Sequence, residues 1–397
     1  MEVAEQLRNL LQGVDRVVPE SELMERLAEG RPLRVKLGMD PTAPKVTLGW
    51  AVVLRKLRQF QELGHTAVLI VGDFTAQVGD PSGQSEARRR LSADEVRAHA
   101  QGVLEGFRRL LLPASLEIRY NSEWLAALDM HGVLELTSKV TVAQLLQRED
   151  FRFRLEEGLP ISLMEFLYPL LQGMDSVAVR ADVELGGSDQ LWNLLTGRDI
   201  QARYGSRPQI AMTVPLLVGT DGHQKMSQSL GNFIAIDDDP GEMFGKVMSL
   251  PDEAMPQYFR LATDLPETER ESLIAALEEG TAHPGETKRL LGRSIVGLYW
   301  GEESALSAEV AFDRVFKEHG RPQEVGVFTI PAGTTIYLPR IMKEAGMATS
   351  NAEARRLIAQ GAVRVDGEKV TVEELPRSAL VGRVLQAGRR RFVRLQD

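Results

Sequence analysis

The sequence predicts an α/β protein: a Rossmann-like, doubly wound parallel sheet, followed by a helical domain and a small α+β domain. One observation is the run at residues 66–72, which is apolar throughout, as strands of a parallel sheet covered on both faces are. Another is that strand and helix patterns alternate up to about residue 235, after which strand patterns stop until the tail. We place the domains at 1–235, 236–316 and 334–397, with a linker at 317–333.

Composition excludes several classes of protein. With 397 residues, 43% of them hydrophobic, the chain can bury a large core. No stretch approaches the roughly 20 apolar residues that span a bilayer, and the first residues do not resemble a signal peptide, so we expect a cytoplasmic protein with no membrane partner. Cysteine is absent, which excludes disulfides and thiol chemistry, and the six His show no metal-ligand spacing, so we expect no protein-bound metal.

Charge is distributed unevenly along the chain. The net charge is −9, which argues against indiscriminate nucleic-acid binding. Residues 340–397, however, hold 12 Arg or Lys against 7 Asp or Glu, so the tail carries +5 and the remainder −14. Arg355 and Arg356 lie on a helix expected at 351–360, where they are either a solvated pair or a contact for RNA.

The first strand and helix form a candidate nucleotide site. Residues 34–39 read as a strand, the sequence Asp40-Pro41-Thr42 breaks it, and helical periodicity then continues to Gly64. With the strand at 66–72 this makes a βαβ unit with a right-handed crossover. The first turn of its helix presents unpaired N–H groups that suit a phosphate, and Gly49 leaves room for a ribose or base.

The loop at 73–83 is long and rich in glycine. It is either an ordinary surface loop or a segment that brings Asp80 over the carboxyl ends of the strands, where open α/β sheets bind ligands. Ser92 and Glu95 form a capping-box pattern that opens a helix to residue 112, and residues 116–120 read as the next strand. The α/β alternation therefore continues past the loop.

The helix expected at 162–176 combines an apolar stripe with a polar face. Tyr168, Gln172 and Asp175 fall close together around the helix axis. This face is either solvated or one wall of a polar pocket for a small zwitterion or phenol, because a carboxylate accepts hydrogen bonds and an amide does both.

Two further segments extend the pattern toward residue 232. Residues 183–190 read as a second strand that breaks at two glycines into a helix, and residues 209–218 read as a buried strand. The Gly-, Ser- and Lys-containing loop at 219–232 is of the kind that closes a cation over phosphates.

Taken together, these segments resemble the class I aminoacyl-tRNA synthetases, and within them the bacterial tyrosyl-tRNA synthetases. The resemblance covers nearly the whole chain and rests on five motifs in family order: Pro41-Thr42 with Leu48-Gly49, Gly79–Gly83, Tyr168 with Gln172 and Asp175, Gly186–Gln190, and Lys225–Ser229. The tail from Tyr337 is similar to the family's S4-like RNA-binding domain.

The resemblance implies roles for residues of this chain. Asp80, Tyr168 and Gln172 would hold the substrate's ammonium group, and Asp175 would accept a hydrogen bond from its phenol. The remaining roles concern ATP: Asp189 and Gln190 at the ribose and carboxyl region, Gly38 and Asp40 beside them, Leu217 and Val218 at adenine, and Thr42 and Lys225 at the triphosphate. Mg²⁺ would accompany the ATP, Arg355 and Arg356 would contact tRNA, and the family implies a homodimer.

The chain departs from the family pattern at four positions. Thr47 and Trp50 stand where the family has two catalytic histidines, and Gln228 replaces the second lysine of the Lys-Met-Ser-Lys-Ser loop. Losing three hydrogen bonds to charged groups could cost on the order of 4 to 9 kcal/mol, although Thr47 and Gln228 can still donate. We therefore expect impaired adenylation, without assuming that the protein is inactive. Lys36 lies where many members place a second phenol-binding Tyr, which weakens the assignment to tyrosine.

The leading hypothesis is a tyrosine–tRNA ligase that uses ATP to make tyrosyl-adenylate and transfers the tyrosyl group to tRNA(Tyr). The altered phosphate-site residues favour an alternative, a paralogue that binds or adenylates an amino acid with weak or no tRNA charging. A third possibility is an RNA-binding regulatory protein with an idle catalytic domain. The intact pocket motif argues against that third reading, because RNA binding does not require it.

Overall fold

The computed structural model describes residues 2–80, 92–316, 326–331, 333–388 and 391–396. The chain divides into two compact units, residues 1–302 and 303–397, which are considered one at a time. In the described residues, no helix is both long and apolar enough to cross a membrane.

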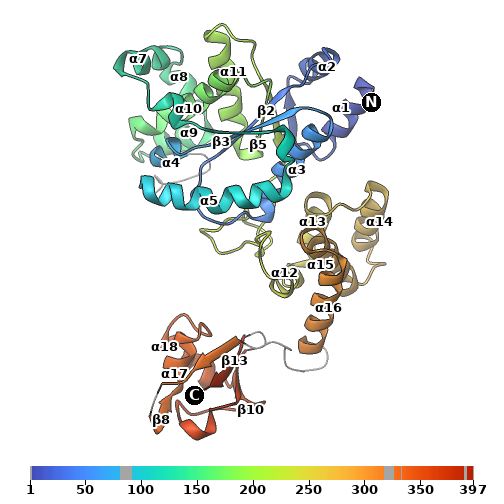
Figure 1. Ribbon diagram of the computed structural model, residues 1–397, viewed down its shortest axis with the longest axis vertical. Coiled ribbons are helices and arrows are strands. Elements are labelled where there is room, and N and C mark those ends of the chain that lie inside the picture. The colour runs from blue at the N-terminus through green and yellow to red at the C-terminus, as the bar shows by residue number, and fades with distance from the viewer. Residues whose placement is uncertain (1, 81–91, 317–325, 332, 389–390, 397) are drawn as a thin grey trace. The chain divides into compact units, whose positions relative to one another are not determined.

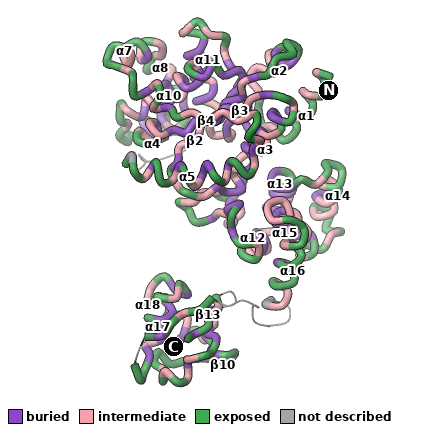
Figure 2. Tube along the Cα trace, viewed as in Figure 1, coloured by how far each residue is buried: buried purple, intermediate pink, exposed green. Residues whose placement is uncertain are grey.

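The first unit is built on a six-stranded sheet with the order β1-β6-β5-β2-β3-β4. Figure 1 labels β2, β3 and β5 among its strands. Its strands are β1 (Arg16–Val18), β2 (Arg34–Met39), β3 (Thr66–Val71), β4 (Leu116–Tyr120), β5 (Val183–Gly187) and β6 (Ile210–Val214). All neighbours run parallel except β1, which pairs antiparallel with β6. This confirms the doubly wound α/β fold that the sequence predicts. The sheet is mostly buried, as Figure 2 shows, and β3 is apolar because helices cover both of its faces.

The strand order reverses between β2 and β5. Connections α3 (Leu48–Glu62) and α5 (Ala93–Leu110) lead outward from β2 to β3 and β4, while α11 (Leu191–Arg203) leads the opposite way from β5 to β6. Right-handed crossovers place such oppositely directed helices on opposite faces of the sheet. The carboxyl ends of β2 and β5 therefore open onto a crevice at the point of reversal.

Capping interactions fix where the key helices begin. Thr47 caps α3, accepting a hydrogen bond from Trp50 N at 3.4 Å. The predicted capping box of Ser92 and Glu95 is present at α5. A second box, between Ser162 and Glu165, starts α10 (Leu163–Val179), which packs against α11.

Further helices complete the first unit. Those before the helical region are α1 (Val3–Leu11), α2 (Glu20–Ala28), α4 (Thr75–Val78), α6 (Ser122–Leu125), α7 (Met130–Ser138), α8 (Val142–Leu145) and α9 (Glu149–Glu156). Those within it are α12 (Pro240–Met248), α13 (Met255–Ala262), α14 (Glu267–Glu278) and α15 (Pro284–Trp300). Helices α12 to α15 thus lie within the segment 236–316 that the sequence predicts to be helical.

The second unit begins with α16 (Glu302–Phe316) and contains a small α+β domain. Its five-stranded sheet has the order β10-β9-β12-β13-β7, and a separate pair joins β8 and β11. These strands are β7 (Gly326–Thr329), β8 (Thr335–Tyr337), β9 (Val363–Val365), β10 (Glu368–Lys369), β11 (Glu374–Pro376), β12 (Val384–Ala387) and β13 (Arg391–Gln396). Helices α17 (Leu338–Glu344) and α18 (Asn351–Ala359) pack together over a core that includes Met342 and Leu385.

The compact units divide at residue 302, inside the helical domain predicted at 236–316. Most of the linker predicted at 317–333, namely residues 317–325 and 332, lies outside the described residues. The four-part division from the sequence therefore stays a prediction.

A buried cluster of charges joins α2 to the amino ends of β2 and β5. The Arg26 side chain is fully buried and donates from Nη1 to Asp182 Oδ1 at 3.0 Å. Arg31 donates to both oxygens of Asp182, at 2.7 and 2.8 Å, and Arg34 N donates to Oδ2 at 2.9 Å. Burial alone would raise the pKa of Asp182, but these donors hold that pKa below its ordinary value.

We predict that Asp182→Ala lowers the free energy of unfolding by about 3 to 5 kcal/mol, because it leaves the Arg26 guanidinium buried without its partner. Urea unfolding at pH 7 measures the change. Glu62→Ala is the control: Glu62 is 54% exposed and pairs with Arg58, so its loss should cost less than about 1 kcal/mol. Since the folded-state pKa of Asp182 is lowered, the contribution of this carboxylate should fade as pH falls below about 4. Equal losses in the two variants would contradict the assigned role of the cluster.

Candidate active site

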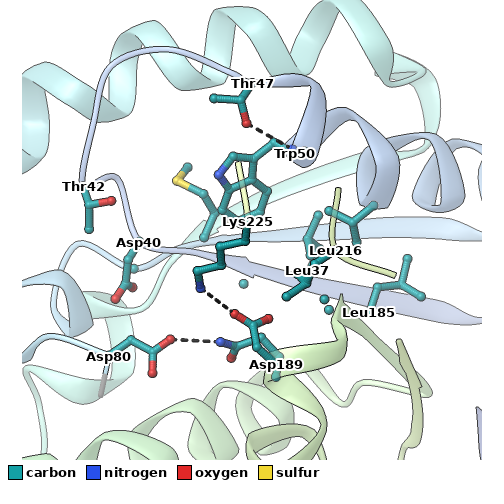
Figure 3. Close-up of a pocket in the computed structure, with 18 of the residues that line it drawn as sticks. Leu37, Asp40, Thr42, Thr47, Trp50, Asp80, Leu185, Asp189, Leu216 and Lys225 are labelled. Atoms are coloured by element: carbon teal, nitrogen blue, oxygen red, sulfur yellow. Dashed lines mark hydrogen bonds and ion pairs between the residues drawn. The ribbon is translucent and has the colours of Figure 1, made fainter. Parts of the chain in front are cut away.

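A cavity of about 650 Å³ opens at the carboxyl ends of β2 and β5 (Figure 3). It collects most of the residues singled out in the sequence. The predicted site residues that line it are Gly38, Asp40, Thr42, Thr47, Gly49, Trp50, Asp80, Tyr168, Gln172, Asp175, Asp189, Gln190, Leu217, Lys225 and Gln228. Val218 and Lys36 are not among the lining residues, and Arg355 and Arg356 are exposed on α18 in the second unit.

The α10 face that the sequence left open is part of the cavity wall. Asp175 is 4% exposed and accepts hydrogen bonds from Trp124 Nε1 at 2.9 Å and Asn121 Nδ2 at 3.4 Å. Burial raises the pKa of Asp175 to about 7, although the charge of Lys36 and these two donors act to lower it. The cavity therefore contains a buried acceptor whose ionisation is finely balanced at neutral pH.

Asn121, Trp124 and Thr75 are functional candidates that the sequence reasoning missed. Thr75 accepts from Asn121 Nδ2 at 2.9 Å and donates to Asp40 Oδ1 at 2.7 Å. One signal was available, since Asn121 directly follows the predicted strand at 116–120 and so stands at the carboxyl edge of the sheet.

Asp40 links the end of β2 to α10. Its Oδ2 accepts from the Tyr168 hydroxyl at 2.9 Å, and burial among acidic groups raises the pKa of Tyr168, so the phenol stays neutral. Gly72 allows this approach, since a Cβ there would lie 2.0 Å from Asp40 Oδ1. The glycine that follows β3 thus makes room for the carboxylate that follows β2.

Lys36 is held beneath the cavity. Its side chain is fully buried, and its ammonium lies 2.9 Å from Glu184 Oε1. It also donates to Ser176 Oγ at 2.7 Å and to the backbone oxygen of Gln172 at 2.9 Å. The predicted contact of Lys36 with a phenol stays a prediction, because here the ammonium is engaged with protein groups.

Asp80 lies at the cavity, over the carboxyl ends of the strands, as one of the two sequence interpretations expects. It accepts from Gln190 Nε2 at 3.0 Å, and Gln190 in turn accepts from Asn193 Nδ2 at 3.1 Å. Arg148 donates to Asn193 at 3.2 Å. Residues 81–83 of the same motif lie outside the described residues.

The Lys225 loop, residues 225–229, crosses the opposite side of the cavity. Figure 3 shows the Lys225 side chain reaching toward Asp189, and its Nζ lies 2.9 Å from Asp189 Oδ2. Met226 N donates to Leu217 O at 2.9 Å, and Ser227 N donates to Asn232 Oδ1 at 2.8 Å. The loop is well anchored in this arrangement.

The Gln228 side chain forms two hydrogen bonds with the backbone of Lys45. Its Oε1 accepts from Lys45 N at 3.2 Å and its Nε2 donates to Lys45 O at 2.7 Å, which ties the Lys225 loop to the segment before α3. The other two altered positions also have structural partners. Thr47 is the α3 cap, and the Trp50 ring lies 5.7 Å from that of Phe107. Met226 lies beside Gly49, its Cβ 3.6 Å from where a side chain would begin.

Comparisons with known proteins agree with one another. Residues 28–317 match the family of tRNA synthetases class I (W and Y), and residues 338–376 match the S4 domain. The chain is 50% identical to the tyrosine–tRNA ligase of Moorella thermoacetica, covering 99% of this chain and 96% of that protein. It is 47% identical to that of Thermotoga maritima, covering 98% and 97%.

Solved structures support the fold. The tyrosyl-tRNA synthetase of Archaeoglobus fulgidus, solved with L-tyrosine, matches with a TM-score of 0.62 at 22% identity, covering 77% of this chain and 99% of that one. That of Aeropyrum pernix matches with a TM-score of 0.63 at 20% identity, covering 80% and 99%.

We predict that the stability of the ligand-free protein falls as Asp175 ionises. Its folded-state pKa is raised to about 7, so between about pH 4 and 7 the folded protein holds a proton that the unfolded chain has lost. Unfolding free energies should therefore drop with rising pH more steeply for the natural protein than for Asp175→Asn. The difference between the two should change by about 2 to 3 kcal/mol from pH 5 to pH 8. A difference that stays constant with pH would mean that the pKa of Asp175 in the folded protein has its ordinary value.

Proposed function

The chain belongs to the tyrosyl-tRNA synthetases of class I and is a tyrosine–tRNA ligase; from this premise we propose which residues carry the reaction. Tyrosine and ATP give tyrosyl-adenylate and pyrophosphate, and the tyrosyl group then passes to the terminal ribose of tRNA(Tyr). The observation that carries the proposal is the arrangement of the cavity, with a buried acceptor, Asp175, at one end and a cation, Lys225, over another part. The alternative of a non-charging paralogue is not favoured, because the similarity to tyrosine–tRNA ligases extends over the whole chain.

The amino acid binds at the α10 wall. Asp175 accepts from the phenol of tyrosine, while Trp124 and Asn121 keep the carboxylate in place. Asp80, Tyr168 and Gln172 surround the ammonium group. An amino acid without the hydroxyl would not supply this third hydrogen bond to the buried Asp175, which costs binding energy.

ATP binds toward α3 and the Lys225 loop. Asp189 and Gln190 hold the ribose and carboxyl region, with Gly38 and Asp40 beside them. The rest of the nucleotide site comprises Leu217 and Val218 at adenine and Thr42 at the triphosphate. Lys225 binds the phosphates. To do so, its ammonium must move away from Asp189, which it contacts in the ligand-free protein. Mg²⁺ arrives on the phosphates of ATP as part of the substrate, and the described residues contain no cluster of three or more acidic or His side chains that could hold it.

Catalysis needs no side-chain nucleophile. A carboxylate oxygen of tyrosine attacks the α-phosphorus, the bond to the pyrophosphate oxygen breaks, and the protein positions the two groups and stabilises the developing charge. Thr47 and Gln228 offer neutral donors, and Trp50 contributes packing. Lys225 is therefore the residue whose positive charge stabilises the negative charge that develops on the phosphates. This distribution predicts slower adenylation than a site with three further charged donors would give.

The assembly we propose is a homodimer. Exposed apolar side chains are concentrated between α7 and the start of α10: Met130, Leu134, Val142, Phe153, Leu155, Leu159 and Leu163, the last 81% exposed. Such a concentration of apolar surface favours burial against a second protein surface.

The second unit is the tRNA contact, in which Arg355 and Arg356 would meet phosphates. Because tRNA, ATP and free tyrosine are its substrates, we place the enzyme in the cytoplasm.

Amino-acid-dependent exchange between ATP and pyrophosphate tests the proposal. We expect exchange with tyrosine, and an increase of at least about 10-fold when Thr47→His, Trp50→His and Gln228→Lys are combined, with little change in tyrosine affinity, because the added groups would contact charge that develops in the transition state. Gln228→Lys alone should gain less, since it also loses both bonds to Lys45. If tyrosine binds but neither protein exchanges pyrophosphate, the proposed catalytic roles fail.

The dimer prediction uses Leu163→Arg. A charge at this position should be costly to bury, so we expect the variant to sediment as a monomer at concentrations where the natural chain is dimeric. Val372→Arg, at a 50% exposed position in the second unit, is the matched control and should leave the mass unchanged. Identical masses for all three proteins would argue against this interface.

A further inference from the structure

We propose that the buried pair of Lys36 and Glu184 is a positioning element that fixes the Gln172 side-chain amide with its oxygen toward the amino-acid pocket. This inference rests on the proposed function, because it concerns the group that meets the substrate's ammonium. Neither Lys36 nor Glu184 touches the substrate in this account. Both act through Gln172.

The pair is completely enclosed and fully hydrogen-bonded. Lys36 and Glu184 are each 0% exposed, and Lys36 Nζ lies 2.9 Å from Glu184 Oε1. On the other carboxylate oxygen, Oε2, Glu184 accepts from Ser176 Oγ at 3.2 Å and from Gln209 Nε2. With Gln172 Nε2, which also contacts Oε1, the carboxylate accepts from four donors, two on each oxygen. Such complete pairing offsets the cost of burying the two charges.

The same carboxylate dictates the orientation of Gln172. Gln172 Nε2 lies 3.0 Å from Glu184 Oε1, and an ionised carboxylate can only accept, so the amide nitrogen must face it. The Lys36 ammonium lies 2.9 Å from the same Oε1 oxygen, so this oxygen accepts from Lys36 as well as from Gln172. Rotating the amide by half a turn would set its oxygen against the carboxylate and lose the bond.

The consequence reaches the cavity, which Gln172 lines. With its nitrogen engaged below, the amide offers its oxygen to a ligand. An ammonium is a donor only, so it requires acceptors, and the opposite orientation would present N–H groups to it. Lys36 in addition donates to the Gln172 backbone oxygen at 2.9 Å, which holds this turn of α10 in place.

The test compares tyrosine with 3-(4-hydroxyphenyl)propionate, which has the phenol and the carboxylate but no amine. The variant is Lys36→Met combined with Glu184→Gln, which removes both charges together and avoids leaving one buried alone. Its matched control is Arg154→Met combined with Glu165→Gln, another buried pair, with side chains 3% and 7% exposed and a separation of 2.5 Å. Dissociation constants are measured by titration calorimetry with each purified protein.

We expect the Lys36/Glu184 variant to bind tyrosine about 10-fold more weakly or worse, as loss of a hydrogen bond to a charged group implies, and to bind the amine-free analogue within a factor of about 3 of the natural protein. The control should change neither constant by more than that factor. Equal weakening of both ligands would mean that the pair only supports the fold. Unchanged tyrosine affinity would mean that tyrosine binding does not depend on the pair's orienting the Gln172 amide. Either result overturns the proposal.

Lys36→Gln combined with Glu184→Gln provides a second variant should the first double substitution not fold, because it leaves no charge buried and keeps hydrogen-bonding groups at both positions. The new amide at position 184 can accept from or donate to Gln172, so both orientations become available and tyrosine affinity should fall while the analogue binds unchanged. If the natural protein itself does not prefer tyrosine over the amine-free analogue, the ammonium site of the proposed function fails, which is a different outcome from failure of the positioning role.

Discussion

The cavity depends on the reversal of strand order between β2 and β5. Because helices leave these two strands toward opposite sides, no connection covers their carboxyl ends, and polar groups can gather there without breaking the sheet. Asp40 follows β2, and Asp189 and Gln190 follow β5, while α10 supplies a third wall. The requirement for close approach at this point explains why Gly72 follows β3, since any side chain there would collide with Asp40.

Burial gives the site its chemistry at a cost in stability. Carboxylates and a lysine lie where water cannot solvate them, so each needs partners from the protein, and the networks around Asp182 and Glu184 supply them fully. Asp175 is different. It accepts from two neutral donors, and burial raises its pKa to about 7, so one further donor would stabilise its charged form. A ligand hydroxyl can supply that further donor. Until it binds, the incompletely paired carboxyl lowers the stability of the ligand-free protein.

Local signals in the sequence sufficed for the fold and for the α10 wall of the cavity, whereas the resemblance to the synthetases supplied most of the other lining residues, among them Asp40, Thr47 and Gln228. Periodicity identified the parallel strands, the capping box identified the start of α5, and the spacing of Tyr168, Gln172 and Asp175 placed them on one helix face. Local signals could not identify contacts between residues that are far apart in the sequence. Gln228 binds the backbone of Lys45 across 183 positions, and Lys36 meets Glu184 because two strands are neighbours, facts that arise only on folding. The role of Trp124 was hidden for the same reason.

The hydrogen bond from Trp124 to Asp175 also has a spectroscopic consequence. Indole absorption and emission respond to the charge next to the ring nitrogen, and Trp124 Nε1 lies 2.9 Å from Asp175 Oδ1. The chain has four Trp, so replacing the other three by Phe would leave a single chromophore attached to this carboxyl. The fluorescence of this single Trp would then report the protonation of Asp175 as pH changes. Proton titration could not resolve this group, because the chain has 56 acidic residues.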